Sequence, residues 1–306
     1  MSKKRKRSSS ALQNLSQIRA MKKWSPLFLF PTFIAFCIGF VWPFIWGIYL
    51  SFFRFKTLRN TTFVGIDNYV KAFTDNNFGH AFWFTVLFTV VSVVVINIVA
   101  FAVAYVLTKG IKGSNVFRTV FFMPNLIGGI VLGYLWKIIL DEIIARFLNS
   151  SLALNSTYGF WGLVILVAWQ QIGYMMIIYI AGLQAVPEDM LEAAKIDGAS
   201  GWQTLFKVTI PNVMPSITIC TFLSLTNGFK LFDQNLALTG GYPYIINPDG
   251  TAVHTTEMLA LNIYNTFYVG ANSRGVAQAK AVLFFILVAT LAIAQLSATR
   301  KKEVQQ

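Results

Sequence analysis

The sequence predicts an all-α fold built from membrane-spanning helices, and three observations support this prediction. Hydrophobic residues make up 56% of the chain and charged residues only 12%, against a charged share of about 25% in soluble domains. The mean hydropathy is +0.60. The apolar residues also gather in long runs without charge, separated by polar segments. We therefore expect a polytopic membrane protein rather than a soluble domain with a large core.

The chain begins with a basic segment, residues 1–24, which holds eight Lys and Arg and no acidic residue. Such a segment could bind nucleic acid, or it could be a solvated cytoplasmic tail that orients the first span and contacts anionic lipid headgroups. Aromatic residues are not interleaved with the cations, and no folded nucleic-acid-binding domain follows. The second interpretation is favoured, so we expect a basic cytoplasmic tail that contacts membrane lipid and no nucleic-acid partner.

Six apolar runs follow the tail. They cover residues 25–53, 81–108, 119–136, 160–186, 208–229 and 281–299. About 20 helical residues cross a hydrocarbon core of about 30 Å, so each run is long enough to span it. A charged side chain at the middle of a span would cost about 2.5–3.5 kcal/mol, which explains why these runs exclude charge. Six transmembrane helices are therefore predicted.

The orientation follows from the distribution of Lys and Arg. With six spans, the tail, the loops 109–118 and 187–207 and the C-terminus share one side, which carries sixteen of the 25 cations. The loops on the other side are longer, so their cation density is lower. The positive-inside rule then places both termini in the cytoplasm. The predicted organisation is the tail 1–24, a first span with its external loop at 25–80, a five-span core at 81–300 and a cytoplasmic tail at 301–306.

One polar segment, residues 187–211, has a more defined pattern than the other connections. Acidic residues open it, at positions where the helix dipole favours anions. Gly198 can supply the left-handed residue that ends a first helix. Ser200 followed by Gln203 is a capping-box pattern that starts a second helix, residues 201–207. We therefore expect a cytoplasmic helix-turn-helix. Its four acids against two bases suit docking to a basic protein cleft better than anchoring the topology.

This segment closely resembles the EAA loop of ABC importer permeases. The matching residues are Glu192, Ala193, Ala194, Asp197, Gly198, Ala199 and Pro211. A Glu-Ala-Ala tripeptide alone would suit any amphipathic connector, but here the Gly and Pro also stand at the family spacing. Val208 and Ile210 are conservative departures from the family's Ile-x-Leu-Pro. The resemblance implies that this loop fits a cleft on an ATPase subunit and couples its closure to the pore.

Two external segments are similar to the carbohydrate-type branch of these permeases. Residues 63–69 match F-x-G-x-x-N-Y, and residues 238–243 read Leu-Thr-Gly-Gly-Tyr-Pro. The combined similarity covers about residues 81–299 and includes maltose- and glycerol-phosphate-type members. It implies a bacterial inner-membrane complex with a second permease (a heterodimer), two copies of an ATPase, and an extracytoplasmic solute-binding protein that delivers a sugar.

Residues that could contact a polar solute lie within the apolar runs. They are Asn97, Trp169, Gln170, Gln171, Tyr174 and Asn227. Amides and aromatic faces suit an uncharged, hydroxyl-rich solute, because they hydrogen-bond hydroxyls and stack on sugar rings. The alternative is structural: amides in spans often bond neighbouring helices, and Trp or Tyr can face lipid.

The energy source is expected to lie in a partner. The sequence contains no G-x-x-x-x-G-K-[ST] phosphate loop, so we expect no cofactor in this chain and ATP use by the ATPase subunit. A secondary transporter or channel is an alternative, but no carboxylate or lysine lies deep in a predicted span to form an ion relay. An integral-membrane enzyme is a further alternative. The sequence offers no catalytic constellation and no set of metal ligands for it, so we expect no enzyme.

Overall fold

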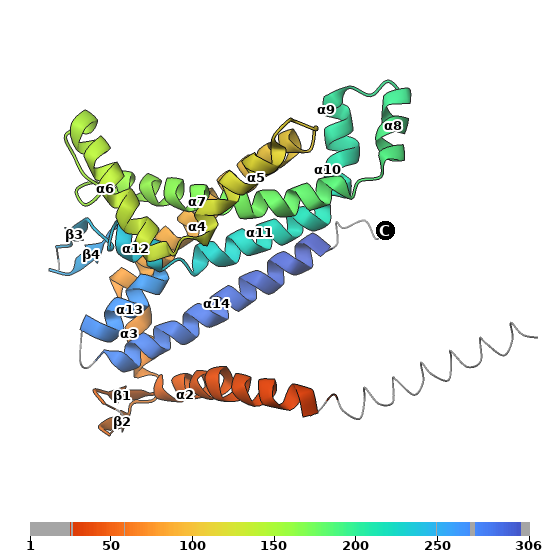
Figure 1. Cartoon of the computed structure of the whole chain (residues 1–306). Coiled ribbons are helices and arrows are strands. Elements are labelled where there is room, and N and C mark those ends of the chain that lie inside the picture. The colour runs from red at the N-terminus through yellow and green to blue at the C-terminus, as the bar shows by residue number, and fades with distance from the viewer. Residues whose placement is uncertain (1–24, 26, 58, 249, 270–272, 301–306) are drawn as a thin grey trace, which may run out of the picture.

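The computed structural model describes residues 25, 27–57, 59–248, 250–269 and 273–300. The predicted tails, 1–24 and 301–306, lie outside the described residues. Long helices lie side by side, with two β-hairpins and short helices at one end and the 187–213 segment at the other (Figure 1). We call these the hairpin end and the coupling end. The first long helix starts, and the last one finishes, at the coupling end.

Four described helices are long and apolar enough to cross a membrane. They are Leu27–Leu50, α4 (Asn76–Leu107), α7 (Ser156–Gln184) and α14 (Arg274–Arg300). The first contains a π-helical stretch, η1 (Cys37–Val41), before α2 (Trp42–Leu50). α4 begins where the Asp75 side chain accepts a hydrogen bond from the Asn77 backbone N–H. These helices correspond to predicted runs 25–53, 81–108, 160–186 and 281–299.

The prediction of one continuous helix for residues 119–136 is wrong. The chain forms α5 (Ser114–Phe122), a 3-10 turn η2 (Met123–Leu126) and α6 (Gly129–Leu148), and the two helices diverge from the turn (Figure 1). Pro124 lies in this turn. Proline has no N–H to donate and its ring clashes with the preceding helical turn. α6 also extends beyond residue 136 and carries four charged residues there, so this helix is not confined to the charge-free run.

The run 208–229 is also not one straight helix. The segment that begins at residue 187 is called the coupling segment, and its second arm consists of α9 (Gly201–Thr204), η3 (Leu205–Thr209) and α10 (Ile210–Asn212). The chain then bends by 71° before α11 (Met214–Phe229). The described residues therefore contain four apolar helices of spanning length, or five if this bent pair counts as one span. This count does not confirm six spans.

α7 is the central helix, packed against α4, α5 and α11. Close backbone approach explains Gly173 in this helix, because a Cβ there would collide with the carbonyl oxygen of Phe121 in α5. The core of the bundle consists of buried side chains of α4, α7 and α11, including Phe88, Ile96 and Met176. The helical prediction thus holds for the bundle.

Strands occur only at the hairpin end of the described chain. They form two antiparallel hairpins, β1 (Phe53–Phe55) with β2 (Thr61–Phe63) and β3 (Tyr244–Ile246) with β4 (Ala252–His254). Three short helices accompany them: α3 (Asp67–Thr74), α12 (Asp233–Leu238) and α13 (Leu259–Val269). The amide of Asn68, in the F-x-G-x-x-N-Y motif, donates to the carbonyls of Ser51 (2.8 Å) and Phe53 (3.0 Å). This motif therefore fixes the end of the first long helix.

A buried cation joins three helices at the hairpin end. Lys280, in the second turn of α14, is 1% exposed. Its Nζ lies 2.6 Å from Asp75 Oδ2 and donates to Asn262 Oδ1 and Thr266 Oγ1, each at 2.8 Å. The sequence prediction started this span at residue 281 and so missed Lys280. The helix begins earlier because these three partners satisfy the ammonium group inside the protein.

Candidate coupling segment and polar pocket

The coupling segment forms the expected helix-turn-helix. Its first arm is α8 (Glu188–Ile196) and its second begins with α9. Gly198 adopts φ +75°, the left-handed conformation that favours glycine. Ser200 Oγ accepts from the Gln203 N–H at 3.3 Å, and Gln203 Oε1 accepts from the Ser200 N–H at 2.7 Å. The capping box is therefore closed, and the two arms project together from the ends of α7 and α11 (Figure 1).

The predicted coupling residues differ in how far their side chains are exposed. Glu192, Ala193, Asp197 and Gly198 are exposed, Ala199 and Pro211 are half-buried, and Ala194 is 9% exposed. A Cβ at Gly198 would meet no atom within 4 Å. The turn is thus open on its outer side and available to a partner.

Large apolar side chains on this surface escaped the sequence reasoning. Ile196 is 85% exposed, Trp202 73% and Phe206 60%. Exposed apolar groups next to acidic ones are typical of a surface that contacts another protein or the membrane. The sequence could have indicated this surface, because these apolar residues lie on both sides of the Asp-Gly turn.

A polar pocket of about 330 Å³ lies at the junction of α7, the end of α11 and the start of α12. It is lined by Asn125, Gln170, Gln171, Asn227, Lys230, Leu231, Phe232, Asp233 and Gln234. Three of the six predicted solute contacts, Gln170, Gln171 and Asn227, therefore come together. Five amides and one aromatic ring around a small cavity can hydrogen-bond and stack on a hydroxyl-rich solute.

Hydrogen bonds join four of the five amides of this pocket. Gln234 Nε2 donates to Gln170 Oε1 at 2.7 Å, and Gln170 Nε2 donates to the Ile127 carbonyl at 3.1 Å. Asn227 Nδ2 donates to Gln171 Oε1 at 3.4 Å, a long bond. Gln170 is thus held by two partners. Gln171 and Asn227 keep more of their hydrogen-bonding capacity for a ligand.

The sequence reasoning missed four polar lining residues: Asn125, Lys230, Asp233 and Gln234. Asn125 lies in the η2 turn, and the other three follow the last turn of α11. They become neighbours of Gln170 and Gln171 only through the break at Pro124 and the short α12. A signal existed in the Pro-Asn dipeptide and in the polar cluster after Asn227.

The other predicted contacts lie elsewhere. Trp169 is 43% exposed and packs edge-to-face on Trp136, with ring centroids 5.5 Å apart. Tyr174 is 36% exposed. Neither lines the polar pocket.

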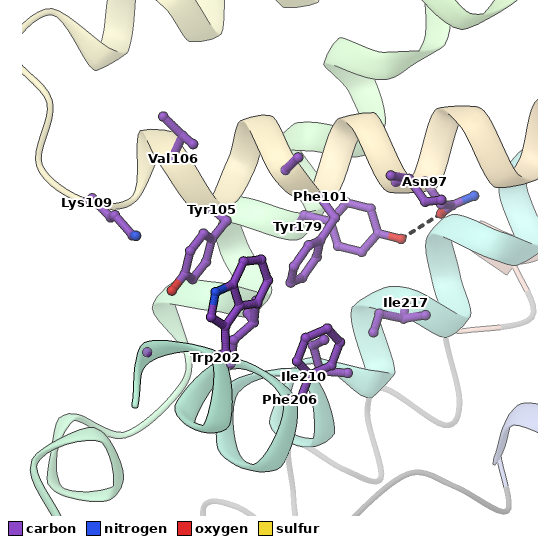
Figure 2. Close-up of a pocket in the computed structure, with 14 residues that line it drawn as sticks. Asn97, Phe101, Tyr105, Val106, Lys109, Tyr179, Trp202, Phe206, Ile210 and Ile217 are labelled. Atoms are coloured by element: carbon purple, nitrogen blue, oxygen red, sulfur yellow. Dashed lines mark hydrogen bonds between the residues drawn. The ribbon is translucent and has the colours of Figure 1, made fainter. Parts of the chain in front are cut away.

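Asn97 also lies apart from the polar pocket. It accepts from Tyr179 Oη at 2.6 Å and donates to Ser224 Oγ at 2.9 Å, so it joins α4, α7 and α11 as the structural alternative predicted. It lines a different cavity, an apolar groove (Figure 2). Among the described residues, no group of three or more His, Cys, Asp and Glu could hold a metal ion.

The chain is similar in sequence to permease proteins of bacterial transport systems. The chain is 40% identical over 290 residues to a probable starch degradation products transport system permease protein of Thermoanaerobacterium thermosulfurigenes, covering 92% of this chain and 96% of that protein. It is 30% identical over 292 residues to a multiple sugar-binding transport system permease protein of Streptococcus mutans, covering 92% and 97%.

The fold matches a bacterial ABC transporter involved in the import of the acidic polysaccharide alginate. The TM-score is 0.76 at 18% identity, covering 94% of this chain and 99% of that one, so this likeness concerns the fold alone. A family model described as binding-protein-dependent transport system inner membrane component matches residues 104–301. The chain therefore belongs to the family of binding-protein-dependent transport system inner-membrane components.

Proposed function

We propose that the chain is the permease subunit of an ATP-driven ABC importer and forms half of the path for a sugar or oligosaccharide. One observation carries this proposal: α11 runs from the coupling segment at one end to the polar pocket at its other end, and the middle of α7 lines the same pocket. Relatives named for starch degradation products and for multiple sugars support a carbohydrate as the solute.

The pocket chemistry favours a neutral, hydroxyl-rich solute. Asn125, Gln171 and Asn227 supply both donors and acceptors, and Phe232 supplies an aromatic face. Lys230 and Asp233 carry opposite charges in the same lining, so the pocket has no net attraction for an ion of either sign. A hydroxyl can donate to Asp233 or accept from Lys230, so these two residues suit a sugar as well.

The coupling route follows the chain. An ATPase that closes around the segment 187–211 would push α8, and α8 is joined to α9 through the Gly198 turn. The force passes along α9, η3 and α10 to the 71° bend at Val213, then along α11 to Asn227 in the pocket. We infer that ATP-driven closure rotates α11 about this bend and alters the pocket.

Partners follow from the same layout. The ATPase dimer would contact the coupling end, a solute-binding protein the hairpin end, and a second permease would complete the path. The coupling end faces the cytoplasm in this proposal, because the cation-rich loop 109–118 suits that side and the ATPase that would dock on the acidic coupling segment works there. Both termini then lie in the cytoplasm and the protein is a multi-pass component of the bacterial cell membrane.

Uptake in cells that lack this chain tests the proposal. The cells would be supplied with labelled maltooligosaccharides and other neutral sugars, with the chain restored from a plasmid. We expect restored, ATP-dependent uptake of at least one neutral sugar. Uptake that continues after the partner ATPase is inactivated would contradict the proposal and would favour a secondary transporter.

A further inference from the structure

An apolar groove of about 740 Å³ lies apart from the polar pocket, between α4, α7, α11 and the second arm of the coupling segment. Figure 2 shows aromatic rings of α4 and α7 facing rings of the coupling segment across it. These rings belong to Phe101, Tyr105, Tyr179, Trp202 and Phe206. The groove differs from the polar pocket in that almost its whole lining is hydrocarbon.

The two ends of the groove differ in chemistry. Lys109 lies at one end, with its Nζ 4.3 Å from the centroid of the Tyr105 ring, and Trp202 lies beside them (Figure 2). Lys, Tyr and Trp together are typical of the boundary between membrane and water. Ile217 and Asn97 line the other end, and the Asn97 amide is held by Tyr179 and Ser224. In a membrane-embedded chain, this arrangement suits a groove that opens at the membrane surface and extends toward the hydrocarbon interior.

Much of the apolar lining is exposed in the isolated chain, and contact of this surface with water would be unfavourable. Trp202 is 73% exposed, Phe206 60% and Val106 50%. Apolar surface left in water costs about 25 cal/mol per Å², so these side chains need an apolar cover. A cover that matches both ends must be a long apolar chain with an anionic group next to Lys109. A phospholipid has this chemistry, and anionic lipids are abundant at the cytoplasmic surface.

We propose that the groove binds an anionic phospholipid, with an acyl chain between α4 and the second arm of the coupling segment and the phosphate beside Lys109. The bound chain covers Trp202 and Phe206 and so holds the coupling segment against α4. The proposal requires the coupling end to lie at a membrane surface. It does not depend on which solute is transported.

Lipid retention measures this binding directly. The full chain, purified with its partner subunits, would be stripped of lipid and supplied with phosphatidylglycerol or phosphatidylcholine of identical acyl chains. Native mass spectrometry then counts the lipids retained. We expect wild type to prefer phosphatidylglycerol, and Lys109→Gln to lower that preference about fivefold, the effect of one cation at an anionic surface. Lys112→Gln, an exposed loop cation outside the groove lining, is the matched control.

Blocking the groove gives a second measurement. Val106→Trp should abolish the retained lipid, while Val94→Trp should not, because Val94 is an exposed residue of α4 outside the groove. A photocrosslinker placed at position 202 should label phosphatidylglycerol. Equal lipid preference in Lys109→Gln and Lys112→Gln would overturn the proposal. Crosslinks from position 202 that reach only the second permease would overturn it as well, and this outcome does not depend on how Val106→Trp folds.

Discussion

Gly198 is the residue at which backbone conformation matters most for the coupling segment. Its φ of +75° lies in the left-handed region, which costs other L-residues about 1–2 kcal/mol but suits Gly and, to a lesser degree, Asn. The space around it is open, so side-chain volume is not the constraint within this chain. Gly198 therefore suits the backbone conformation of the turn, and its role in docking stays a prediction.

Gly198→Asp should abolish uptake while the protein still inserts into the membrane. The substitution adds a negative charge and a side chain at the outer side of the turn, where the ATPase would dock. Uptake of labelled sugar, together with a blot of the membrane fraction, measures both effects. Gly198→Asn is the matched control, because Asn tolerates the same φ without the charge, and it should keep more uptake. Normal uptake by Gly198→Asp would count against a coupling role for this turn.

Gln171→Ala should weaken the apparent affinity for the solute about three- to tenfold. Gln171 has one long hydrogen bond, to Asn227, so it has capacity to bind a hydroxyl worth about 0.5–1.5 kcal/mol. Concentration-dependent uptake measures the change. Tyr174→Ala is the control on the same helix, because Tyr174 lies outside the polar pocket. Equal effects of the two substitutions would remove the pocket from the solute path.

At the scale of residues, the sequence predicts correctly those features that depend only on neighbouring residues in the chain. The Gly198 turn and the Ser200–Gln203 capping box are read from a few neighbouring residues, and the structure confirms both. The solute contacts depend on tertiary neighbours. Gln171 and Asn227 meet, whereas Trp169 faces outward, and helical spacing alone does not determine which side of α7 faces the pocket.

At the scale of elements, two breaks in the helices determine where the polar pocket and the coupling segment lie. The turn at Pro124 sends α6 away from α5, and the bend at Val213 redirects α11. Both breaks fall inside apolar runs, so a search for charge-free stretches reads each run as one span. Proline marked both places, at Pro124 and Pro211. Composition could not determine the direction of either bend, because that depends on packing.

Gly173→Ala should destabilise the packing of α5 on α7. A Cβ there would collide with the Phe121 backbone, and such overpacking costs about 1–3 kcal/mol or more. The melting temperature of the purified complex should fall by several degrees. Gly79→Ala is the matched control, because Gly79 lies in α4 and a Cβ there would meet no atom within 4 Å. Alanine favours a helix more than glycine does, so the melting temperature of this variant complex should be equal to that of the wild type or slightly higher. A Gly173 variant as stable as the Gly79 variant would contradict the packing described.

Lys280→Met should destabilise the hairpin end by about 2–3 kcal/mol, because the ammonium joins α14 to Asp75, Asn262 and Thr266. Methionine keeps the apolar stem. A thermal-unfolding double-mutant cycle with Asp75→Asn isolates the ion pair, since Asn also caps α4 well. Additive effects of the two substitutions would show that Lys280 and Asp75 do not interact.

At the scale of the whole molecule, the proposed function assigns two tasks to connected helices. The coupling end presents acidic and apolar side chains on a helix-turn-helix, and the polar pocket lies at the far end of α11, against the middle of α7. The membrane class and the coupling segment were predictable from composition and a spaced motif. The exact arrangement of spans was not, because the described helices are interrupted within two of the six runs.

The central claim is that closure of an ATPase around the coupling segment drives transport, and site-specific crosslinking tests it most directly. A photocrosslinker would replace the exposed Ala193 in the assembled complex, with and without ATP. We predict a crosslink to the ATPase subunit whose yield changes when ATP binds. Labelling of lipid or solvent alone, in a complex that still takes up solute, would contradict the claim.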